Sequence, residues 1–144
     1  MAPIVILKND ILRLTHLADT VASEFMMETY AKERWDEYNV ELNAINYLVV
    51  WVAEAPWVNA LRAQVSGVML EGLCSALDSF QKSIFDILRS WKEFEREIKR
   101  QRQNGGELAG EQYEEFFREE IGPTLQRAAQ ALKKDWISSS RGTP

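Results

Sequence analysis

Few side chains in this sequence could carry out acid–base or nucleophilic chemistry. His16 is the one histidine and Cys74 the one cysteine among the 144 residues. A single histidine can act as a base or a pH sensor and a single cysteine as a nucleophile, but neither has a partner at the spacing of a catalytic pair. We therefore expect His16 to be a partly exposed helix residue and Cys74 an inert residue at the edge of a core.

Two further patterns could carry chemistry but are incomplete. Ser79 and Lys82 have the Ser-x-x-Lys spacing of penicillin-recognising acylases, whereas the Ser-Asp-Asn and Lys-Thr-Gly elements of those enzymes are absent. Glutamates at Glu24, at Glu28 and within 114–120 could bind a hard cation, yet no turn-rich calcium loop accompanies them. We therefore predict no catalytic residue, no cofactor or cofactor-binding residue, no metal-binding residue, and no enzyme.

Charge and composition exclude several other classes of protein. The chain has 17 Lys and Arg residues against 22 Asp and Glu residues, so it lacks the positive field that binds nucleic acid. Its longest uncharged run, 42–53, is well short of the ~20 apolar residues that a membrane span needs. One cysteine forms no internal disulfide, which is typical of a reducing compartment. We expect a cytoplasmic protein without a nucleic-acid partner.

Apolar residues recur at helical spacing along most of the chain. The longest row alternates steps of three and four residues without a miss, which leaves little room for a strand. Its members are Leu70, Leu73, Leu77, Phe80, Ile84, Ile87, Trp91, Phe94 and Ile98. Similar rows run from Leu7 to Phe25 and from Trp35 to Val52. Small residues at Ala76, Ser83 and Ser90 favour a helix with neighbours on two sides over a two-stranded coiled coil.

These rows predict an all-α fold, an antiparallel bundle of four to five helices. We expect one domain at 1–137, followed by a flexible polar tail at 138–144. Unbroken, the helices would exceed the ~38 Å diameter of a compact domain of this length. Either the helices break or the molecule is elongated.

Helix breaks are predicted at four places. The hydrophobic phase slips near 35–39, where Asp36 or Asn39 could cap a new helix; Asn9 or Asp10 could cap the first one in the same way. Pro56 predicts a break at 55–56, and Gly105 one at 104–110. Gly122-Pro123 predicts a kink at 122–123, and an irregularity is expected at 66–67 or at Gly72.

Aromatic residues give the one feature that points to a function. Five tryptophans are many for a chain of this size. They could simply fill a core, or some could line a partner groove or an apolar ligand pocket. The candidate interaction residues are Tyr47, Trp51, Trp57, Trp91 and Trp136. Because residues 49–52 are apolar on all sides of a helix, some of this surface is expected to be buried against another chain.

We therefore expect a non-enzymatic interaction or assembly module that binds a protein partner through helix faces and self-associates as a homo-oligomer. Two alternatives stay open. One is a membrane-active helical domain in which 44–57 or 65–77 inserts after the bundle opens; we do not favour a membrane partner. The other is a sensor domain with a pocket for an apolar small ligand.

Overall fold

The computed structural model describes residues 3–54 and 68–141, and every regular element in this part of the chain is helical. The elements are α1 (Pro3–Met27), α2 (Trp35–Ala53), α4 (Val68–Gln103), α5 (Gly110–Glu115), the π-helix η1 (Phe116–Ile121) and α6 (Gly122–Arg141). The predicted all-α fold is confirmed. Helix α6 includes the first four residues of the segment that was expected to form a polar tail.

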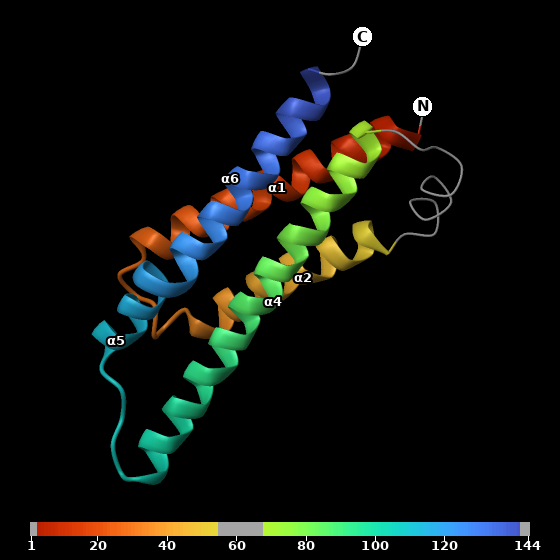
Figure 1. Cartoon of the computed structure of the whole chain (residues 1–144). Coiled ribbons are helices and arrows are strands. Elements are labelled where there is room, and N and C mark those ends of the chain that lie inside the picture. The colour runs from red at the N-terminus through yellow and green to blue at the C-terminus, as the bar shows by residue number, and fades with distance from the viewer. Residues whose placement is uncertain (1–2, 55–67, 142–144) are drawn as a thin grey trace.

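Each long helix packs against two others. Helix α1 contacts α2 and α6, and α4 contacts the same two helices from the other side (Figure 1). Helices α1 and α6 run antiparallel: Lys8 near the start of α1 meets Trp136 near the end of α6, whereas Phe25 near the end of α1 lies beside Gly122. With 36 residues, α4 alone is about 54 Å long, so the molecule is elongated.

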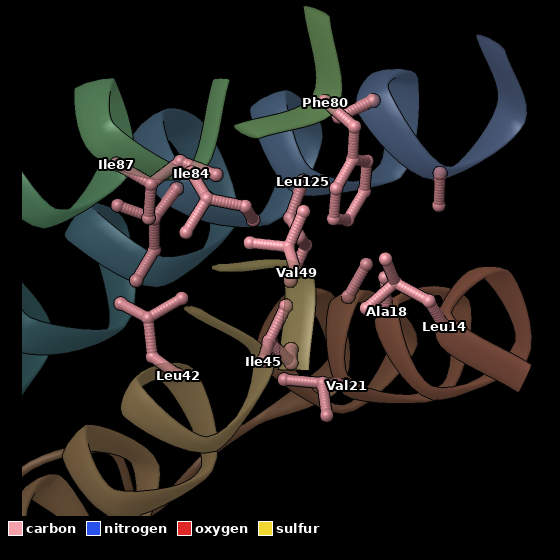
Figure 2. Close-up of a cluster of buried hydrophobic side chains, with 14 of the residues drawn as sticks. Leu14, Ala18, Val21, Leu42, Ile45, Val49, Phe80, Ile84, Ile87 and Leu125 are labelled. Atoms are coloured by element: carbon pink, nitrogen blue, oxygen red, sulfur yellow. The ribbon is translucent and has the colours of Figure 1, made fainter. Parts of the chain in front are cut away.

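One buried cluster joins the four long helices. Figure 2 shows side chains of α1, α2, α4 and α6 converging on it, among them Leu14, Ile45, Ile84 and Leu125. The apolar rows predicted from the sequence supply most of its members, and between Leu73 and Ile98 the row on α4 is buried except for the half-buried Phe94. The periodicity therefore identified the inner face of each helix.

The first helix break lies earlier than predicted. Helix α1 ends at Met27 and α2 begins at Trp35, so the connection is 28–34 and not 35–39. Neither Asp36 nor Asn39 caps α2, because Arg34 is its N-cap residue, and Asn9 and Asp10 lie inside α1. The connection is ordered by the buried Glu28, whose carboxylate accepts a hydrogen bond from the backbone N–H of Tyr30. The spacing of apolar residues carries no information about this contact.

The other glycine and proline signals have mixed outcomes. The stop at 104–110 is confirmed: Gly105 has a left-handed φ of 77°, and the Gly106 N–H donates to the Gln101 carbonyl oxygen at 2.9 Å. No irregularity occurs at Gly72, which lies inside α4. The break predicted at 55–56 and the irregularity at 66–67 fall outside the described residues.

The kink expected at 122–123 is replaced by a π-helical segment in a continuous helix. The Gly122 N–H donates to the Phe117 carbonyl oxygen five residues earlier, and the wide turn ends just before Pro123, which has no N–H to donate. Gly122 also lies against α1. A Cβ atom at this position would lie 2.8 Å from Met26 Cγ, so glycine allows the two helices to approach closely.

Candidate functional site: the outer face of α2

Trp91 belongs to the core and is not available to a partner. Its side chain is 2% exposed and stacks on Trp35 with ring centroids 3.9 Å apart. Its indole Nε1 donates a 2.8 Å hydrogen bond to Glu95 Oε1, and Phe116 and Phe117 pack edge-on around it. Buried aromatic rings packed in this way stabilise the fold.

Trp136 links α6 to α1 through a hydrogen bond. It is half-buried against the core, and its Nε1 donates a 2.8 Å hydrogen bond to the carbonyl oxygen of Lys8. Tyr47 and Trp51, by contrast, are 69% and 56% exposed. Trp57 falls in 55–67, outside the described residues. The structure thus separates two exposed candidates from two that pack within the chain.

Tyr47 and Trp51 belong to a continuous apolar surface on α2. Successive residues of a helix are turned by 100°, so five exposed apolar residues of α2 fall within an arc of about 100°. They are Val40, Ala44, Tyr47, Leu48 and Trp51, here called the outer stripe. Sequence reasoning missed Val40 and Leu48, which are 69% and 38% exposed.

Helix α2 is apolar on two opposite sides. The inner side packs into the core through Tyr38, Leu42, Ile45, Val49 and Val52. A helix at the surface of a globular protein normally has polar residues opposite its buried side. The outer stripe breaks this rule over about three turns, because 40–51 spans about 17 Å along the axis.

The outer stripe has acidic residues along its edges. On a helical projection Glu37 and Glu41 lie along one edge and Asp36 and Glu54 along the other, and the segment 35–54 contains no Lys or Arg. Arg34, just before the helix, is already paired: its guanidinium contacts Glu28 at 2.7 Å and Glu37 at 2.8 Å. The surface is therefore apolar at its centre and negative at its rim.

One edge of the stripe holds two carboxyl groups close together. Burial, together with the neighbouring carboxylate of Glu24 on α1, raises the pKa of Glu41. The Glu41 Oε2 atom is buried and has no hydrogen-bond partner. This position would gain from a positive charge, because a cation would relieve the repulsion between the two groups.

Glu28 fixes the start of α2 and hence the direction of the stripe. Its side chain is 7% exposed and accepts hydrogen bonds from the Tyr30 N–H at 2.6 Å, from Arg34 and from the Tyr38 hydroxyl. Its backbone carbonyl accepts a 2.9 Å hydrogen bond from Arg118 of η1. A buried carboxylate with this many donors orders the connection between α1 and α2. From the sequence alone, Glu28 is considered only as a possible ligand of a hard cation.

Charged residues dominate the lining of two hollows on the described surface, which does not suit an apolar ligand. A hollow of about 450 Å³ lies where the start of α2 meets the end of α4, but five of its eight lining residues are charged. They are Lys32, Asp36, Glu95, Lys99 and Arg102. Glutamates also line a groove between α4 and η1, at Glu93, Glu97, Glu119 and Glu120. Both sides of this groove thus carry acids, and Arg100 forms an ion pair within α4, with Glu97.

The reactive side chains singled out in the sequence differ in their helix and in their exposure. His16 is exposed on α1, Cys74 is buried, and Ser79 and Lys82 are exposed in the middle of α4. Within 3–54 and 68–141, no group of three or more His, Cys, Asp or Glu residues is placed to hold a metal ion. Over the same ranges, no helix combines the length and the apolar character needed to cross a membrane.

Comparison of the chain with protein-family models, with curated proteins and with solved structures finds no match. The outer stripe of α2 is therefore identified as the candidate site from its exposure, its apolar side chains and its acidic rim alone.

Proposed function

We propose that the protein is a non-enzymatic interaction module that binds one helix of a protein partner against the outer stripe of α2. The observation that carries this proposal is the double-sided character of α2: one apolar face is buried in the core and a second one, with Tyr47 and Trp51, stays exposed. Contiguous exposed apolar surface on a soluble domain is typical of a protein-binding site.

The shape of the stripe suits a helix. It is about 17 Å long and one helix wide, and its side chains recur at i, i+4, i+7, i+8 and i+11 from Val40. A partner helix that packs along it would contact it over about three turns through side chains of the same spacing. Tyr47 and Trp51 are of the residue types that dominate binding energy at interfaces.

The stripe is rigidly presented, which favours binding. Its helix is anchored from the inner side by the core and at its start by Glu28 and Tyr38. A partner therefore would not have to order this surface, so less conformational entropy is lost on binding. A location in the cytoplasm belongs to the proposal, since the buried Cys74 needs no oxidising compartment.

Site-specific photocrosslinking tests the proposal in the cells that make the protein. A benzophenone amino acid at position 47 of the full chain should give one discrete protein adduct. The same probe at Gln130, exposed on α6 away from the stripe, should give none. Trp51→Glu should abolish the adduct at 47, because a charge within the stripe opposes apolar packing.

Equal adducts at positions 47 and 130 would contradict the proposal, and so would an adduct at 47 that Trp51→Glu leaves unchanged. Circular dichroism should show that Trp51→Glu keeps its helical content, because the parent side chain is more than half exposed.

A further inference from the structure

The negative charge at the rim of the outer stripe indicates the charge that its partner carries. Within 35–54 the acidic residues are Asp36, Glu37, Glu41 and Glu54, the segment has no Lys or Arg, and of the four acids Glu37 is paired with Arg34 just before the helix. Interfaces are arranged so that opposite potentials meet. A partner helix with acids beside its apolar residues would be repelled along both edges, whereas one with Lys or Arg at those positions would be attracted.

The two cations that come just before α2 in the sequence are already engaged. Arg34 contacts both Glu28 and Glu37 and lies over the Tyr38 ring at 4.6 Å. Lys32 pairs with Glu107 at 3.3 Å. Burial and the neighbouring Glu24 raise the pKa of Glu41 and outweigh Arg34, which acts to lower it, and the buried Oε2 atom of Glu41 has no hydrogen-bond partner. This edge of the stripe is therefore the place where a partner's cation would contribute most.

A second copy of the chain fits this surface poorly. Two α2 helices packed face to face would bring together six acidic residues, Asp36, Glu37 and Glu41 from each copy, and no basic residue from either helix. Elsewhere in the described residues, the outer face of α4 carries charges of both signs, Asp78, Lys82, Asp86 and Arg89, and offers Phe85 as its one exposed large apolar side chain. A single ring does not match a stripe of about three turns.

We infer that the occupant of the outer stripe is a helix of another protein, with apolar residues along one face and Lys or Arg on both sides of that face. This inference rests on the proposed function and adds the chemical class of the partner. One basic residue of the partner lies beside the Glu24–Glu41 pair. The remaining basic residues face Asp36, Glu37 and Glu54.

Three synthetic peptides test the inference. Each is an 18-residue helix with the same Leu and Ala seam, and the positions beside the seam are Lys in the first, Gln in the second and Glu in the third. Binding of each fluorescein-labelled peptide to the full chain is measured by anisotropy. The Lys peptide should bind at least tenfold more tightly than the Glu peptide, and this ratio should shrink as NaCl is raised, because salt screens rim charges.

A variant of the rim locates the effect. Asp36→Asn with Glu41→Gln should weaken binding of the Lys peptide at least threefold and leave the Gln peptide unchanged. The control is Glu119→Gln with Glu120→Gln, which makes the same change of charge in the groove between α4 and η1. It should leave all three affinities unchanged.

The outcomes separate the inference from the proposed function. If the Glu peptide binds as tightly as the Lys peptide and Trp51→Glu abolishes both, the partner's charge is overturned while helix docking on the stripe stands. If no peptide binding depends on Trp51, the proposed function fails.

Two further results would also overturn the inference. One is a dimer at tens of micromolar by light scattering that Trp51→Glu dissociates, because the occupant would then be a second copy. The other is Trp51-dependent binding to vesicles of anionic phospholipid, which would make the stripe a membrane surface.

Discussion

The Tyr38 hydroxyl donates a hydrogen bond to the buried carboxylate of Glu28, ten residues earlier in the chain. This contact joins the first turns of α2 to the end of α1, and it orients the helix that carries the outer stripe. Both side chains are buried, so water cannot readily replace either hydrogen-bonding partner if the other side chain is removed.

Tyr38→Phe should lower the free energy of unfolding by about 1–3 kcal/mol, because a buried carboxylate loses one of its donors. Urea denaturation measures the change. Tyr30→Phe is the matched control: this ring is 65% exposed, and its variant should stay within about 0.5 kcal/mol of the parent. Equal effects of the two substitutions would contradict the role given to the Tyr38 hydroxyl.

The exposed and buried tryptophans should differ sharply in their effect on stability. Trp91→Ala should cost about 3–5 kcal/mol, because it leaves a cavity in the aromatic cluster around Trp35. Trp51→Ala should cost less than about 1 kcal/mol, since more than half of this side chain is exposed. Chemical denaturation of both variants checks this prediction. A large loss for Trp51→Ala would place that residue in the core and remove it from the site.

Gly122→Ala should destabilise the contact between α1 and α6. The added methyl group would meet Met26 Cγ and the Phe117 carbonyl oxygen at less than 3 Å, and overpacking of this kind costs about 1–3 kcal/mol. Gly110→Ala is the control, because nothing lies within 4 Å of its Cβ position. Its stability should be unchanged or higher by up to about 1 kcal/mol, since alanine favours the helix. The difference can be read from thermal unfolding, and equal melting temperatures for the two variants would contradict the close approach.

Two glutamates should affect the pH dependence of stability with opposite signs. The pKa of Glu41 is raised, because its ionised form is unfavourable in the folded protein. This side chain therefore lowers the free energy of unfolding once the pH has risen through its folded-state pKa. Glu41→Gln should therefore raise the urea midpoint near neutrality and leave it unchanged below the ordinary glutamate pKa of 4.5.

Glu97 is the opposite case. Hydrogen bonds from Arg100 and Gln101 lower the pKa of this exposed carboxylate to about 2. Its stabilisation is present above the ordinary pKa of 4.5 and is lost as the pH falls toward 2. Glu97→Gln should lower the urea midpoint slightly near neutrality, by an amount that disappears at acid pH. Shifts of the same sign in both variants would contradict these assignments.

Local pattern was enough to predict the helices and their inner faces. Apolar spacing from Leu73 to Ile98 and from Leu7 to Phe25 depends only on residues within a few turns of one another. The connection at 28–34 was missed because its cause is a carboxylate that is buried by packing with Arg34, Tyr38 and Arg118. Burial of this kind depends on residues up to 90 positions apart.

The candidate site was predicted in part. Tyr47 and Trp51 lie on the exposed face of α2, whereas Trp91 is in the core, where its place in the long apolar row already put it. Val40 and Leu48 could have been found by projecting 35–53 around a helix axis, which gives two opposite apolar arcs. The role of Trp57 stays a prediction.

The π-helical segment at Phe116–Ile121 has a consequence for the length of the chain. Its wide turns take up one residue more than an α-helix would, so everything after Ile121 is rotated by about 100°. One continuous helix therefore carries two sets of buried side chains on the same side. They are the aromatic residues Tyr113 and Phe117 and the aliphatic residues Leu125 and Leu132. A related chain one residue shorter here could form a continuous α-helix in this segment and would keep the same side of its last twenty residues toward α1.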